Sequence, residues 1–310
     1  MSNALSHVTG WLGWLAEAAR ATPASAPTTA PAGEPAPFES LTVPPLLLPF
    51  IAVGACVLLG WIVLRAMRPG KLYLRGTPGR PNRLTVLHLA VPLLGYLLVQ
   101  KGAAAALAPW LNPRGLEDGQ REARLAAAVV AQVAWLAAAL AVSSAAFRGG
   151  LRRGLGLSLR RWLADSVRAA AGYLAVLPVC IGLLLAALAL LPAGLKKIHD
   201  LFVYMRALPG AWQPAIWLSA VVLAPLSEEV YFRGLMQSFI RQQTARPWTA
   251  ILAAAAFFAA IHAPAFQNVV PLFALAVALG YNYERTGRLL SPILMHAMFN
   301  AVNLAAFAAS

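Results

Sequence analysis

Two adjacent carboxylates, Glu228 and Glu229, are followed four residues after the second by Arg233. On a helix, Glu229 and Arg233 share a face with the acid N-terminal to the base, so the spacing predicts an ion pair. Glu228 lies roughly 100° around the helix, because a turn takes 3.6 residues. Carboxylates in different surroundings acquire different proton affinities. The sequence therefore predicts that Glu228 takes part in the chemistry and that Glu229 forms a structural ion pair with Arg233.

Two imidazoles and an amide follow in later apolar segments. His262 lies near the end of one segment, and His296 and Asn300 lie four residues apart on the last, where both face one direction. If these groups meet Glu228, they suffice for hydrolysis by water. The carboxylate takes a proton from water, the imidazoles relay or donate protons, and the amide stabilises an oxyanion.

Each of these groups also has a purely structural explanation. A histidine can pack between helices, a Glu–Arg pair can be a simple salt bridge, and Asn300 can bridge two helices. However, placing a charged group at the centre of a bilayer costs about 2.5–3.5 kcal/mol even on the scale from membrane-insertion experiments, which gives low values. The earlier apolar segments hold almost no ionisable residue, whereas these three hold several. This concentration favours chemistry over three separate structural roles.

The segments that must position these groups are strongly apolar. Of the 310 residues 60% are hydrophobic and only 12% are charged, about half the charge of a soluble domain. We expect an all-α, polytopic membrane helical bundle with about eight transmembrane helices. Their approximate bounds are 46–64, 84–108, 123–147, 167–192, 213–227, 248–263, 267–283 and 290–308. Pro225 is expected to bend or break the fifth helix, whose true end the pattern leaves open.

The formal net charge of +14 has two explanations, nucleic-acid binding or membrane topology. Most lysines and arginines follow the first, third, fifth and seventh spans, which favours topology and no nucleic-acid partner. The positive-inside rule then places both termini outside the cytoplasm of a multi-pass protein in a plasma or inner membrane. The two cysteines, Cys56 and Cys180, lie in apolar runs and predict no disulfide framework.

Three parts follow along the chain. Residues 1–43 are expected to be an extracytoplasmic segment, not a secretory signal; they include a short apolar stretch near residues 11–15 that would suit an interfacial helix, and a partly disordered linker rich in Ala, Pro and Thr. Residues 44–200 hold the first transmembrane helices. Residues 201–310 hold all the candidate catalytic groups.

The order of these groups carries a family resemblance. The chain resembles the CAAX-protease and bacteriocin-processing family of intramembrane endopeptidases over residues 213 to 308. Three motifs in order on separate apolar segments carry the resemblance: Glu228-Glu229-x-x-x-Arg233, Phe258-x-x-x-His262 and His296-x-x-x-Asn300.

The resemblance implies hydrolysis of a peptide bond in a membrane-associated protein or peptide, within or near the lipid bilayer. It implies that Glu228 activates the attacking water with help from His262. It also implies that His296 and Asn300 support the oxyanion, while Glu229 pairs with Arg233 to hold the motif helix.

Two cofactor options stay open: none, or a zinc ion held by Glu228, His262 and His296 with one open position. No His-Glu-x-x-His occurs, and a carboxylate can activate water without a metal, so we favour a metal-free glutamate mechanism. Two other functions compete. One is a non-catalytic binding or immunity protein of the same fold. The other is an ion-coupled transporter, which would need polar groups along a path that the first four spans do not supply.

Overall fold

The computed structural model divides the chain into Met1–Thr42 and Val43–Ser310, and only the second unit contains described residues. The interfacial helix and linker expected before residue 44 lie outside the described residues. The described residues are 47–67, 74, 77, 79–111, 116–192, 195–196, 200–263 and 265–309.

A long helical segment bearing the two glutamates runs from Gly210 to Thr244. It is continuous through Pro225 and ends at Thr244, which gives the end that the sequence pattern left open. The interruption instead takes the form of widened turns, because π-helical stretches lie on both sides of the proline. In order, the segment comprises η5 (Gly210–Trp212), α8 (Gln213–Trp217), η6 (Leu218–Leu223), α9 (Ala224–Glu229), η7 (Val230–Gln237) and α10 (Ser238–Thr244).

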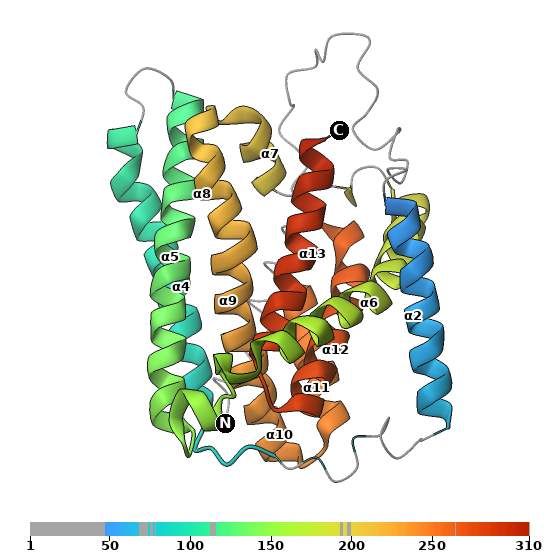
Figure 1. The fold of residues 1–310 in the computed structure, drawn as a ribbon. Coiled ribbons are helices and arrows are strands. Elements are labelled where there is room, and N and C mark those ends of the chain that lie inside the picture. The colour runs from blue at the N-terminus through green and yellow to red at the C-terminus, as the bar shows by residue number, and fades with distance from the viewer. Residues whose placement is uncertain are drawn as a thin grey trace, which may run out of the picture. The chain divides into compact units, whose positions relative to one another are not determined.

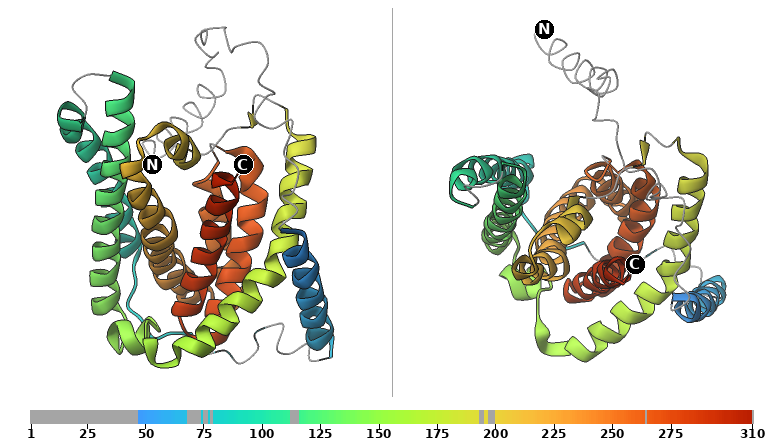
Figure 2. Two further views of the ribbon diagram at one scale, coloured as in Figure 1. Left: turned by 45° about the horizontal axis from the view of Figure 1, so that its top comes forward. Right: turned by 90° about the horizontal axis from the view of Figure 1, so that it is seen from above.

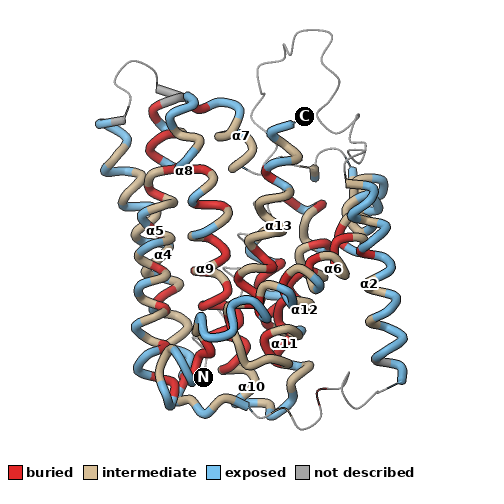
Figure 3. Tube along the Cα trace, in the orientation of Figure 1, coloured by how far each residue is buried: buried red, intermediate tan, exposed pale blue. Residues whose placement is uncertain are grey.

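Three further helices complete the part of the bundle that holds the candidate groups: α11 (Pro247–Ala260), α12 (Phe266–Thr286) and α13 (Leu290–Ala308). Helix α11 packs against both α12 and η7, and α13 packs against η6 and α9 (Figure 1). Buried residues concentrate on α9 and η7 and on the facing parts of their neighbours (Figure 3). The glutamates therefore lie in the interior of the bundle.

Helices that precede residue 191 in the chain flank this part on two sides (Figure 2). On one side, α5 (Leu116–Ala146) packs against α9 and η7, and α4 (Val86–Leu111) packs mainly on α5. On the other side, α6 (Trp162–Leu190) crosses α12 and α13, and α2 (Leu48–Ala66) packs on α6. Short elements fill the connections: η2 (Gly150–Gly154), η3 (Leu159–Arg161) and α7 (Asp200–Ala207).

The described part of the chain is all-α, as expected, and each of the eight expected spans coincides with a helical segment. Five segments are long and apolar enough to cross a membrane: Val86–Trp110, Gly119–Ala146, Leu159–Leu190, Gly210–Thr244 and Leu290–Ala308. Two shorter apolar helices, Leu48–Leu64 and Pro247–Ala260, accompany them. Helix α12 falls in neither group and carries polar residues at both ends, Gln267 and Glu284 among them. The protein is a polytopic helical membrane protein.

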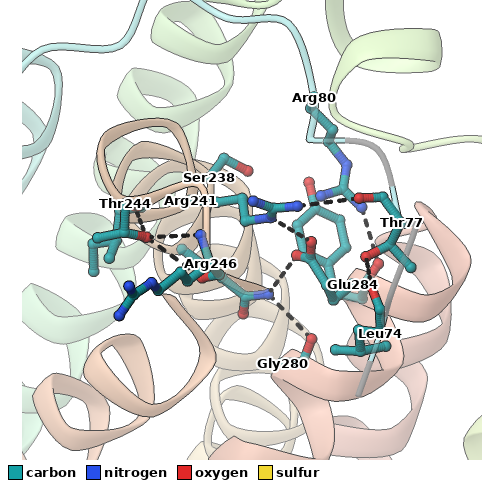
Figure 4. A network of polar contacts seen from close by, with 12 residues as sticks. Leu74, Thr77, Arg80, Ser238, Arg241, Thr244, Arg246, Gly280 and Glu284 are labelled. Atoms are coloured by element: carbon teal, nitrogen blue, oxygen red, sulfur yellow. Dashed lines mark hydrogen bonds and ion pairs between the residues drawn. The ribbon is translucent and has the colours of Figure 1, made fainter. Parts of the chain in front are cut away.

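The basic connections between the helices meet at one end of the bundle. Arg241 donates to Glu284 Oε1 at 3.0 Å and to the carbonyl of Thr77 at 3.1 Å, while Gln237 donates to Glu284 Oε2 at 3.2 Å (Figure 4). Arg80 stacks on the ring of Tyr283, with 3.6 Å from its Cζ to the ring centroid. The connection after α2 is thus fixed to the ends of α10 and α12.

A second ion pair at this end joins the α12–α13 connection to the start of α6. Arg288 lies 2.6 Å from the fully buried Asp165 and also donates to the carbonyl of Ser158. The backbone N–H of Leu289 donates to the carbonyl of Gly156. These contacts hold the α12–α13 connection and the start of α6 together at this end of the bundle.

Candidate active site

A fully buried ion pair forms the centre of the site. Arg233 Nη1 lies 2.8 Å from Glu229 Oε1, and the two residues are 1% and 0% exposed. Arg233 also donates to the carbonyl of Ala276 at 3.2 Å, and its Cζ lies 4.8 Å from the ring centroid of Phe258. A buried pair is tolerated when further hydrogen bonds and good geometry offset the loss of water. These contacts supply that compensation, and they fix η7 against α12 and α11.

His296 lies between the two glutamates. Its Nδ1 is 2.9 Å from Glu229 Oε1, and its Nε2 is 3.9 Å from Glu228 Oε2. An ionised carboxylate only accepts hydrogen bonds, so Nδ1 carries a hydrogen toward Glu229 and Nε2 is directed at Glu228. This contact depends on α13 lying beside α9, which the sequence alone does not specify.

The two carboxylates have different surroundings. The side chain of Glu229 is 0% exposed and accepts hydrogen bonds from both Arg233 and His296. The side chain of Glu228 is 17% exposed, and its contact with His296 is longer than a hydrogen bond. Glu228 is thus the more accessible of the two carboxylates.

His262 lies just beyond the end of α11, in the turn that follows Ala260. Its Nδ1 is 2.7 Å from the carbonyl of Phe258, which can only accept, so Nδ1 carries the hydrogen and Nε2 is the basic nitrogen of the neutral ring. The rings of His262 and His296 lie 4.9 and 5.7 Å from the ring of Phe258. Both imidazoles therefore pack on one aromatic side chain.

Asn300 bridges two helices, as its purely structural explanation predicts. Its Nδ2 donates to the carbonyl of Ala220 in η6 at 2.8 Å, which joins α13 to the glutamate-bearing segment. An amide nitrogen carries two hydrogens, so this bond uses one of its donors.

The proposed zinc ligands do not come together. Among the described residues, no group of three or more His, Cys, Asp or Glu side chains lies close enough to hold a metal ion. Glu228 and His296 approach each other to 3.9 Å, whereas His262 is not part of such a group. In the described part of the chain, Glu228, His262 and His296 are therefore not arranged as a three-ligand zinc site.

Phe258 has a larger role than its motif position indicated. It is fully buried and contacts Arg233, both candidate histidines and the ring of Phe232. The only sequence signal is that it precedes His262 by four residues and shares its helix face. The sequence motifs also do not include Gln237. It lies four residues after Arg233 and, like Arg233, donates hydrogen bonds to α12.

The comparisons with known proteins address the same region. Residues 210–302 match the family model described as type II CAAX prenyl endopeptidase Rce1-like. No curated protein and no solved structure matches the chain. The matched residues include Glu228, Glu229, Arg233, His262, His296 and Asn300, all the candidate groups of the site. This C-terminal part of the chain is therefore similar to the CAAX-protease family.

Proposed function

We propose that this protein is an intramembrane endopeptidase that hydrolyses a peptide bond of a membrane-associated protein or peptide. One observation carries the proposal. A partly exposed carboxylate, Glu228, lies beside an imidazole, His296, that is oriented by a buried ion pair. A general base must be accessible and close to its proton relay, and this arrangement supports both requirements.

In the proposed reaction, Glu228 takes a proton from water as the water oxygen attacks the carbonyl carbon of the substrate. His262 assists through Nε2, the nitrogen that its backbone bond leaves free of hydrogen. The C–N bond then breaks, and the proton held by Glu228 passes to the departing amine. The products are a carboxyl group and an amine, so one water is consumed for each bond cleaved.

The oxyanion needs hydrogen-bond donors. When both nitrogens of His296 carry hydrogen, Nδ1–H donates to Glu229 and Nε2–H is left for the oxyanion. The second N–H of Asn300 is a further candidate donor. Glu229 and Arg233 act through His296 and the helix, without contact with the substrate.

Replacing Glu228 with glutamine tests the proposal. Glu228→Gln keeps the shape but removes the base, so we expect at least about a 10²-fold loss of cleavage. Protein termini in membranes of cells with the wild type or the variant would be compared to find uncleaved substrates. Asp200→Asn provides the matched control, because Asp200 is an exposed carboxylate on α7. Normal processing by a folded Glu228→Gln variant would refute a protease and favour a binding or immunity protein.

The metal-free mechanism has a separate test. We expect purified, active protein to contain less than stoichiometric zinc, and its cleavage to survive a chelator. Stoichiometric zinc whose removal abolishes cleavage would overturn the metal-free mechanism but leave the endopeptidase proposal intact.

A further inference from the structure

Pro225 removes a backbone donor from the helix that carries the glutamates. In an α-helix the N–H of Ala224 would bond to the carbonyl of Ala220 four residues earlier. Here that N–H bonds to Ser219, five residues earlier, because η6 is π-helical. In a π-helix the partner of the Ala220 carbonyl would be the N–H of residue 225. Proline has none, and the N–H of Ala224 bonds to Ser219, so neither of these two donors serves the Ala220 carbonyl.

The amide of Asn300 fills this gap. Ala220 is 5% exposed, and its carbonyl accepts from Asn300 Nδ2 at 2.8 Å. A buried carbonyl without a partner is costly, and the bilayer offers no water to replace one. The donor comes from α13, one turn after His296 on the same face.

We propose that Asn300 is a positioning residue whose side-chain amide replaces the backbone N–H that Pro225 cannot supply, and that this bond sets His296 against Glu228 and Glu229. The bond anchors α13 to η6 one turn from the contact between His296 and Glu229. It also fixes the plane of the amide, which orients its second N–H. The consequence for catalysis rests on the proposed function, whereas the coupling of Asn300 to Pro225 does not.

Four full-length proteins test the coupling: wild type, Asn300→Ala, Pro225→Ala and the double variant. Alanine at 225 restores an N–H five residues after Ala220. We expect Asn300→Ala to lower the Tm of the purified protein in detergent, and to lower it by less than half as much in the Pro225→Ala background. Equal drops in both backgrounds would show that the amide does not replace the missing N–H, and would overturn the proposal.

Asn300→Asp keeps the proposal testable if Pro225→Ala fails to fold. Aspartate has the same shape as asparagine, but its ionised form has no donor and presents an oxygen to the Ala220 carbonyl. We expect a Tm drop at neutral pH at least as large as that of Asn300→Ala. A Tm equal to that of the wild type would overturn the proposal.

A kinetic arm separates positioning from direct oxyanion stabilisation. With a prenylated CAAX peptide as the probe, we expect Asn300→Ala to lower kcat by about 10²-fold with little change in KM, since a small misplacement can have that effect. The double variant should recover at least about tenfold of that loss. If the Tm effects of the two substitutions are coupled but the double variant does not recover kcat, the bond does not position His296 for catalysis, and that part of the proposal is overturned. Absence of wild-type cleavage would count against the proposed function, while the Tm comparison would still be decisive.

Discussion

Glu228 and Glu229 are neighbours in sequence and both approach His296, but their surroundings differ. Glu229 is enclosed by Arg233 and His296, and its Oε2 is buried with no hydrogen-bond partner among the described residues. Glu228 retains access to its surroundings. Glu229, the fully buried carboxylate, therefore holds the site together, and the partly exposed Glu228 is the candidate base.

The buried pair should be more important for folding than for substrate contact. We expect Glu229→Ala and Arg233→Ala each to destabilise the protein by about 3–5 kcal/mol, because each leaves one uncompensated charge in the interior. Thermal unfolding in detergent and protein abundance in membranes measure the effect. The double variant Glu229→Leu with Arg233→Leu should lose less than the sum of the two single variants. Wild-type stability in both single variants would show that the pair is not structural.

Local spacing predicted the helix face shared by Glu229 and Arg233, because four residues along one helix fix their geometry. It did not predict that His296 contacts Glu229, that both imidazoles contact Phe258, or that Asn300 donates to Ala220. Those contacts depend on how three helices pack, and spacing within one helix contains no information about the next.

At the scale of elements, the helix interrupted by Pro225 shows how a break can be accommodated. The sequence indicated irregular backbone near the glutamates, but it did not predict the continuation to Thr244. The π-helical turns on both sides of the proline let the chain continue in one direction. Such turns are frequent at functional sites, and here they flank the two carboxylates.

The connections at the basic end are closely packed where Gly156 meets the α12–α13 connection. Gly156 has φ of +80°, and a Cβ there would overlap the carbonyl oxygen of Gly287. Gly150 is a matched control with φ of +60°, where the nearest atom to an added Cβ is 4.0 Å away.

Both alanine variants carry the backbone strain of a positive φ, so their difference isolates the contact. We expect Gly156→Ala to be less stable than Gly150→Ala by about 1–3 kcal/mol, the usual cost of overpacking. Thermal unfolding of the two purified variants measures the difference. Equal stability would show that the two connections can separate without cost.

At the scale of the whole molecule, the family match and the flanking helices are separate parts of the chain. The match begins at residue 210, so α2, α4, α5 and α6 lie outside it. Apolar composition predicted these helices, but not which neighbour each one packs against. Lipid-facing and protein-facing apolar residues look alike in a sequence.

The orientation in the membrane is a prediction from charge. The positive-inside rule places the basic end in the cytoplasm and the start of α5 outside. In a background where Cys56 and Cys180 are replaced by alanine, Gln120→Cys should react in intact cells with a membrane-impermeant maleimide. Arg160→Cys should react only after the cells are opened; both positions are exposed. The reverse pattern of labelling would invert the topology.

The packing of α2 has a consequence for how the protein is made. Gly54 brings α2 so close to α6 that a Cβ there would overlap the carbonyl oxygen of Leu174. The ribosome reaches α6 roughly 100 residues after α2, which takes on the order of 5–20 s at ordinary rates of synthesis. Helix α2 can therefore take its place against α6 only after the chain between them, including α4 and α5, has been synthesised.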